Sequence, residues 1–165
     1  MGSPVFNADV DARDLITDEK IVTPGDNTNS SGVFGIWVPE GDLAIEIDPP
    51  NGSTFVPLLQ EINVPATGVD LGILTMVEGV AVSGVVVDGT QSVVPGVDLD
   101  FLISASGVEI PTADDNANST GQFSVQVVPD TYDIAFRPSF VTGLAPLVLS
   151  SVSVASNTDL GTVLL

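Results

Sequence analysis

The stretch that decides the fold is Asp-Asn-Ala-Asn-Ser-Thr-Gly-Gln-Phe at residues 115–123. A close copy of it, Asp-Asn-Thr-Asn-Ser-Ser-Gly-Val-Phe, stands 89 residues earlier at residues 26–34. The same offset relates Asp70-Leu71-Gly72 to Asp159-Leu160-Gly161. We therefore expect two copies of one small domain, residues 1–76 and residues 77–165. Tandem arrays of this kind are usually structural or adhesive.

Both copies alternate apolar and polar residues with a period of two, and Gly, Pro, Asn and Asp clusters separate the alternating runs. Val97, Leu99, Phe101 and Ile103, for example, share one face. One buried and one wet face is typical of antiparallel sheets in a sandwich. The pattern predicts an all-β protein of two β-sandwich domains. The expected strands are 5–13, 19–23, 32–38, 42–48, 56–64 and 69–75 in the first copy, and 80–88, 97–104, 107–111, 121–128, 131–138, 145–154 and 160–165 in the second.

The first copy has no counterpart of the strand expected at 80–88. It opens instead at the loop that follows that strand. Two interpretations stay open: the chain is cut from a longer array, with Met1-Gly2-Ser3 as an expression start, or a neighbouring molecule supplies the strand. In either case the first copy should expose unpaired backbone along one edge, and such edges recruit strands.

Several short motifs carry a family resemblance. They are Val82-x-Gly84-x-Val86-x-Asp88, the stretch 95–98, the stretch 118–123 and Val128-Pro129-Asp130-Thr131-Tyr132. Together they resemble the carboxypeptidase regulatory-like domain, whose fold is a transthyretin-like (prealbumin-like), Ig-like sandwich related to the B-type repeats of collagen adhesins. The resemblance implies that Phe34 and Phe123 are equivalent core residues and that Tyr132 lies in the core.

The adhesin relatives often carry a lysine–asparagine isopeptide crosslink, which needs a buried lysine. Lys20 is the chain's one lysine, and Glu109 stands at the matching position of the second copy. The chain therefore departs from that pattern, and we expect no such crosslink.

The charge of the chain is strongly negative. Arg13, Lys20 and Arg137 face 22 acidic residues, for a net charge of −19. Nucleic acids and anionic lipids attract basic surfaces, so neither is an expected partner. No apolar run is long enough for a membrane span, and we expect no insertion. Solubility in a saline or extracellular setting, cation binding and a basic partner remain as explanations of the charge.

The residues for catalysis are scarce, because the chain has no histidine and no cysteine. Serine nucleophiles would lack a base other than Lys20. Acid–base catalysis needs a raised pKa in a pocket. The pairs Asp9/Asp11 and Asp98/Asp100 instead lie on an expected wet face, without nearby aromatic residues to hold a sugar. We therefore predict a protein that is not an enzyme, with no catalytic, cofactor-binding or metal-binding residue assigned.

Calcium is the strongest chemical alternative, because it prefers carboxylate and carbonyl oxygens. One candidate cluster would be made by Asp9, Asp11 and Asp26 with Asn27. Its repeat would be Asp98, Asp100 and Asp115 with Asn116. The competing interpretation is that Asp26 and Asn29 bond the backbone of their own turn, as Asx residues commonly do.

The sequence favours a non-catalytic structural, spacer or adhesion module of a larger prokaryotic surface or secreted protein. Its partners would be neighbouring domains of the same protein, or identical subunits bound through the open edge of the first repeat. The alternatives are a calcium-dependent adhesion module, a subunit of a strand-complemented extracellular filament and a carbohydrate-binding module. Trp37, which should point outward, could serve the last or pack on the second domain.

Overall fold

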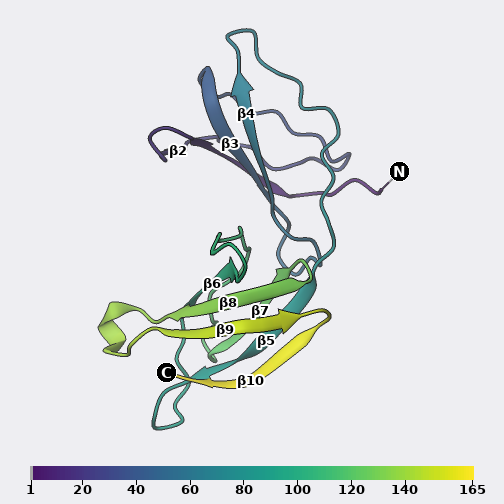
Figure 1. Cartoon of the computed structure of the whole chain (residues 1–165). Helices are drawn as coiled ribbons and strands as arrows, with labels where there is room; N and C mark the ends of the chain where they lie inside the picture. Colours follow the sequence, from purple (N-terminus) through teal and green to yellow (C-terminus); the bar gives the residue numbers. More distant parts are fainter. Residues whose placement is uncertain (1) are drawn as a thin grey trace. The chain divides into compact units, whose positions relative to one another are not determined.

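The computed structural model describes residues 2–165, and the chain separates into two compact units that divide between Val77 and Glu78. Ten strands and one short 3-10 turn make up the regular structure of these residues (Figure 1). The predicted all-β, antiparallel sandwich architecture is confirmed, with one parallel strand pair as an exception. We call residues up to 77 the first unit and residues 78–165 the second unit.

The second unit is a sandwich of two three-stranded sheets. One sheet has the order β10-β5-β7, and the other has the order β6-β8-β9. Strand β5 is the centre of its sheet, pairing antiparallel with β7 and parallel with β10. The strands are β5 (Val80–Val87), β6 (Asp98–Ile103), β7 (Gln122–Val127), β8 (Asp130–Arg137), β9 (Leu147–Val154) and β10 (Thr158–Leu164), with the 3-10 turn η1 (Phe140–Thr142) between β8 and β9.

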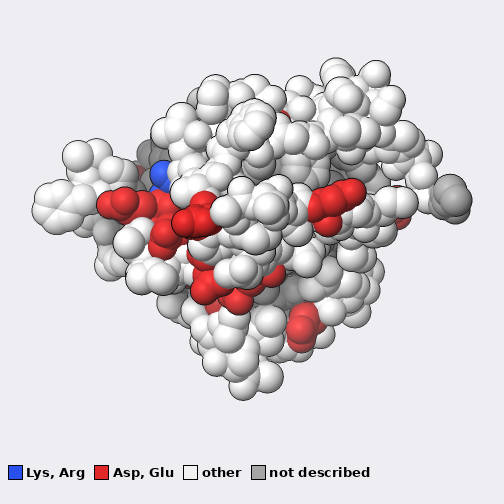
Figure 2. Space-filling model, turned by 90° about the horizontal axis from the view of Figure 1, so that it is seen from above, with Lys and Arg blue, Asp and Glu red and all other residues white. Residues whose placement is uncertain are grey.

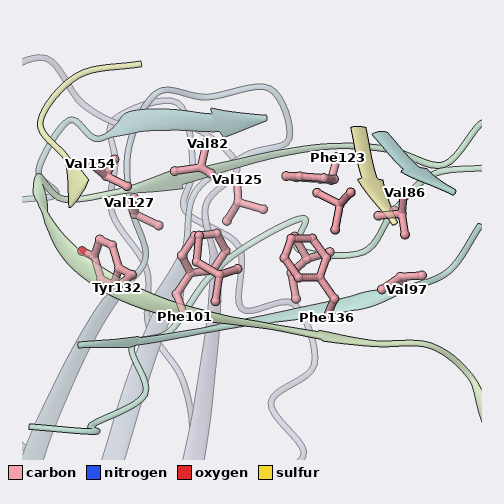
Figure 3. Close-up of a cluster of buried hydrophobic side chains, with 14 of the residues drawn as sticks. Val82, Val86, Val97, Phe101, Phe123, Val125, Val127, Tyr132, Phe136 and Val154 are labelled. Carbon is pink, nitrogen blue, oxygen red and sulfur yellow. The ribbon is translucent and has the colours of Figure 1, made fainter. Parts of the chain in front are cut away.

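The core of the second unit lies between these two sheets (Figure 3). Val82 and Phe123 from one sheet point toward Phe101, Tyr132 and Phe136 from the other. All five are at most 5% exposed. The rings pack edge to face, with Phe101 5.8 Å from Tyr132 and Phe123 5.6 Å from Phe136 between centroids. Aromatic rings favour this arrangement, so it adds stability beyond area burial.

Tyr132 lies in the core as expected, because its ring is fully buried. Its hydroxyl donates to the Val128 carbonyl at 2.7 Å. Burial raises the pKa of this hydroxyl to about 12, with a smaller contribution from the charge of Asp130. The tyrosine therefore stays neutral and keeps its hydrogen bond at any physiological pH.

The first unit has one four-stranded sheet, in the order β2-β1-β3-β4. Its strands are β1 (Asp9–Asp14), β2 (Lys20–Ile21), β3 (Gly41–Asp48) and β4 (Leu58–Val64). The 89-residue offset maps β1, β3 and β4 onto β6, β8 and β9, which pair in the same order. One layer of the sandwich is therefore built alike in both units.

The other layer differs, and here the sequence prediction was wrong. Residues 32–38 and 69–75 were expected as strands, but neither forms a ladder. Their counterparts in the second unit are β7 and β10, and both of those pair with β5. The offset maps β5 onto no residue of this chain. Among residues 2–165 no central strand pairs with the two flanking segments, although their alternation is that of strands.

Two smaller corrections follow from local chemistry. The expected strand 19–23 shrinks to two residues, and the expected strand 107–111 makes only an isolated bridge from Glu109 to Leu102. A proline stands just after the first of these expected strands, at Pro24, and at the end of the second, at Pro111. Because proline has no N–H to donate, a ladder tends to end beside it.

Candidate functional site

The outer face of β1 and β3 in the first unit carries a concentration of carboxylates. The antiparallel register places Asp9 opposite Asp48 and Asp11 opposite Glu46. Like charges directly opposite each other destabilise a sheet. Lys20 compensates in part, since its Nζ lies 2.7 Å from Asp11 Oδ2.

Burial and mutual repulsion raise the pKa values of three of these carboxyl groups. Burial, with the charges of Glu46, Asp11 and Asp9, raises the pKa of Asp48 to about 6. Burial is also the largest cause that raises the pKa of Glu46 and of Asp9. The first unit therefore holds carboxyl groups that favour the neutral form more than isolated carboxyl groups do.

The equivalent face of the second unit carries a different arrangement of charges. Asp98 lies opposite Arg137 and Asp100 opposite Ala135, at the positions that Asp48 and Glu46 occupy in the first unit. Asp100 forms an ion pair with Arg137. Thus both repeats have a pair of aspartates on this face. The strand opposite them carries a basic residue, Arg137, in the second unit and two further acidic residues in the first unit.

The polar loops are stabilised by their own side chains. Asn29 Oδ1 accepts hydrogen bonds from the backbone N–H of Ser31 at 2.8 Å and of Val33 at 3.1 Å. Asn118 does the same for Thr120 and Gln122 in the second unit. For Asn29 these bonds agree with the interpretation that it bonds the backbone of its own turn.

The aspartates of these loops contact hydroxyl groups. Asp26 accepts from the Thr23 hydroxyl at 2.6 Å, and Asp115 accepts from the Thr112 hydroxyl at 2.7 Å. Asp26 therefore bonds a side chain of its turn, whereas in the turn-capping interpretation it would bond the backbone.

The structure brings the calcium candidates near one another but does not arrange them as a metal site. Asp26 and Asp11 both raise the pKa of Asp9, and Asp98 and Asp100 both act on Asp115. Among residues 2–165, no group of three or more His, Cys, Asp or Glu side chains is placed to hold a metal ion. Acidic side chains lie in groups on the face shown in Figure 2, with basic surface only at the edge of one group.

Sequence reasoning missed Glu46 and Asp48 as members of the acidic face. Both stand at alternate positions of a predicted strand, but their distance along the chain from Asp9 and Asp11 hides the contact. Only the pairing register of β1 with β3 places the four carboxylates together. An expected antiparallel pairing of the two runs would have been the signal.

Two segments of the first unit form its second layer without pairing. Among residues 2–165, the backbone N–H and C=O groups of residues 34–38 and 73–76 make no hydrogen bond. We call these two stretches the unpaired segments. Alternate apolar side chains of both pack against the core of the first unit: Phe34, Ile36, Val38, Leu74 and Met76. They therefore lie where strands of a second sheet would lie, and appear as coil in Figure 1.

Phe34 shows the effect of the unpaired layer. The sequence predicted that Phe34 and Phe123 would be buried equivalents. Phe123 is 5% exposed, whereas Phe34 is only partly buried. In the second unit, β5 covers the phenylalanine: a Cβ added at Gly84 would lie 2.8 Å from the Phe123 ring. No strand covers Phe34 in this way within the described chain, so the prediction of equal burial was wrong.

Trp37 points outward as expected and is 96% exposed. A hollow on the second unit is lined by small and polar residues of β5, β7, β10 and the polar loop, among them Gly84, Asp115 and Gly161. No helix among residues 2–165 is long and apolar enough to cross a membrane. None of these features presents a reactive group together with a partner that would activate it.

Comparison with known proteins adds distant likenesses only. No family model matches the chain, and no curated protein matches it. The solved structures that resemble it include the TIE protein of Bacillus anthracis, at 13% identity and a TM-score of 0.37. That match covers 98% of this chain and 30% of the TIE chain. Another is the shaft pilin SpaA of Lactobacillus rhamnosus GG, at 11% identity and a TM-score of 0.41, covering 98% of this chain and 88% of the pilin.

These values are too low to place the chain in a family or to transfer a function. The resemblance to the carboxypeptidase regulatory-like domain therefore still rests on the turn and core residues that carry it. The chain spans about 30% of the length of the TIE protein.

Proposed function

We propose that this chain is a non-catalytic structural module of an extracellular or cell-surface protein, in which sandwich units hold parts of an assembly apart under tension. The observation that carries the proposal is the pairing of β5 with β10. These are the first and last strands of the second unit, and they run parallel to each other.

The parallel pairing determines how the second unit meets a pulling force. Tension between its two ends draws β5 and β10 in opposite directions along their length. The pairing from Thr158↔Val82 to Leu164↔Val87, which has an irregularity between Asp159 and Thr162, is then loaded in shear. The hydrogen bonds of a parallel ladder are slanted but all join one strand to the other, so they resist such shear together. A pull that separates the strands from one end would break them one by one.

The surface chemistry supports an extracellular role. A net charge of −19 favours solubility in a saline or extracellular setting. The partners in this proposal are neighbouring domains of the same protein, or identical subunits.

Single-molecule force spectroscopy tests the proposal. The chain has no cysteine, so introduced cysteines are unique handles. One variant carries Glu78→Cys and a cysteine after Leu165, which loads β5 and β10 in shear. The matched control carries Gly89→Cys and the same C-terminal cysteine. Its handles lie at the same end of the two strands, where the Leu165 N–H donates to the Val87 carbonyl at 2.9 Å.

We expect the shear variant to unfold at a clearly higher force than the control. Equal forces, or a weaker shear variant, would contradict a load-bearing role. Surface exposure is tested separately by labelling intact cells of the source organism with an antibody against this chain. Labelling that requires permeabilised cells would contradict the extracellular proposal.

A further inference from the structure

The first unit retains the flanking parts of a sheet whose central strand it lacks. The segment 33–38 corresponds to β7 and the segment 69–75 to β10. In the second unit β5 pairs with β7 from Val80↔Val127 to Val85↔Gln122, and with β10 from Thr158↔Val82 to Leu164↔Val87. The same two partners are present in the first unit, and among residues 2–165 the backbone groups of residues 34–38 and 73–76 are free.

The turns that prepare the pairing are preserved. Asp70 Oδ1 accepts from the Gly72 N–H at 2.9 Å, and Asp159 Oδ1 accepts from the Gly161 N–H at 2.8 Å. Both glycines have a φ of 66°. The first unit therefore holds the turn at residues 70–72 in the local conformation that the equivalent turn of β10 adopts beside β5.

Gly32 keeps the left-handed backbone conformation that its equivalent, Gly121, adopts beside β5. Gly121, its equivalent, has a φ of 73°, and Gly32 has a φ of 70°. A Cβ added at Gly121 would meet the Val86 carbonyl of β5 at 2.7 Å and the Val93 side chain at 3.1 Å. A Cβ added at Gly32 would meet the Pro4 side chain at 3.0 Å and the Val5 backbone nitrogen at 3.4 Å, but no carbonyl that corresponds to that of Val86.

The carbonyl groups of Gly121 and Gly32 differ in their hydrogen bonding. The Gly121 carbonyl accepts from the Val86 N–H of β5 at 2.8 Å, whereas the Gly32 carbonyl has no partner among residues 2–165. The first unit thus keeps the glycine and the free acceptor, while the strand that would use them is supplied by no part of residues 2–165.

We propose that the unpaired segments of the first unit bind one extended strand supplied from outside residues 2–165, in the place that β5 takes in the second unit. The strand runs antiparallel to residues 33–38 and parallel to residues 69–75. Addition of a strand to an exposed edge is an established mode of peptide recognition. Here the incoming strand would meet an edge on each side.

The second unit specifies the chemistry of this strand. The inward positions of β5 are Val82 and Val86, both fully buried, and Gly84 between them. The glycine is required because a Cβ there would lie 2.8 Å from the Phe123 ring and 2.8 Å from the Gly161 carbonyl. Phe34 and Gly72 stand at the corresponding positions of the first unit. The partner strand therefore presents branched apolar residues two positions either side of a glycine.

The chain's own β5 is not the donor, because both of its edges are already paired within the second unit. The test therefore uses the full chain and a synthetic peptide of residues 80–88, with lysines added at one end for solubility. Hydrogen exchange is measured at the amides of residues 34–38 and 73–76. We expect fast exchange in the chain alone and at least about tenfold slower exchange with bound peptide.

Two peptide variants serve as controls. A Gly84→Leu peptide is more apolar but carries the side chain that the Phe34 ring should exclude, so we expect its affinity to fall at least about tenfold. A Ser83→Thr peptide changes an outward position and should bind as the parent does. Equal binding of the Gly84→Leu peptide would indicate unspecific apolar contact and overturn the proposal.

Three further outcomes would also overturn it. One is the absence of protection with the parent peptide. Another is protection of the unpaired segments in the chain alone at low concentration. The last is protection that rises only with chain concentration, which would assign the position to a second copy.

Discussion

Phe34 and Phe123 stand at equivalent positions of the two units. Substituting each of them measures how much the second layer stabilises its unit. Phe123 is 5% exposed, packs edge to face on Phe136 and is covered by β5 at Gly84. Phe34 packs on the core of the first unit but is only partly buried. The same substitution, phenylalanine to alanine, should therefore have different costs in the two units.

The magnitudes follow from burial. Removing a fully buried phenylalanine side chain costs about 3–5 kcal/mol. A partly buried ring without a covering strand should cost roughly half of that, about 1–2 kcal/mol. A domain of this size has a total stability of only about 4–13 kcal/mol. Phe123→Ala thus removes a large share of the stability of the second unit.

Native-state hydrogen exchange on the full chain measures both effects at once. Amides of β8 report the opening free energy of the second unit, and amides of β3 report that of the first unit. If Phe123→Ala abolishes folding of its unit, Phe123→Leu, with an expected cost of about 1–2 kcal/mol, keeps the comparison measurable. An equal cost for Phe34→Ala and Phe123→Ala, or a larger cost for Phe34→Ala, would refute the reasoning.

Three further predictions concern charge and glycine. The raised pKa of Asp48, about 6, means that folding favours its protonated form, so its contribution is complete below the unfolded pKa of 3.8 and is lost as pH rises through 6. Between pH 7.5 and 5 the first unit should gain about 1 kcal/mol, discounted for partial exposure, and Asp48→Asn should flatten this profile in urea titrations. Sodium chloride should raise the melting temperature by screening the carboxylates. A larger rise with calcium chloride at equal ionic strength, abolished by Asp9→Asn with Asp11→Asn, would indicate specific calcium binding, whereas equal rises would exclude it. Gly121→Ala should destabilise its unit more than Gly32→Ala does, because only Gly121 has a strand carbonyl 2.7 Å from the added Cβ; equal losses in thermal unfolding would contradict this.

Much of the second unit could be predicted from sequence. The alternation of Val97, Leu99 and Phe101 predicted a buried face, and all three are fully buried. This works because side chains on a strand alternate strictly between its two faces. The repeat likewise predicted that β1, β3 and β4 would have counterparts in the second unit. The acidic face could not be read in the same way, since Asp48 meets Asp9 only through the register of two strands that are distant along the chain.

By itself, then, the sequence determined the repeat, the faces of the strands and the scarcity of catalytic groups, because these depend on residue identity and local spacing. Only the tertiary structure decided whether an alternating segment becomes a strand. Residues 33–38 alternate as well as β7 does, yet β7 is a strand because β5 lies beside it. A ladder needs a partner for each backbone group, and the partner lies elsewhere in the chain or outside it. For the same reason Phe34 is left partly exposed while Phe123 is buried.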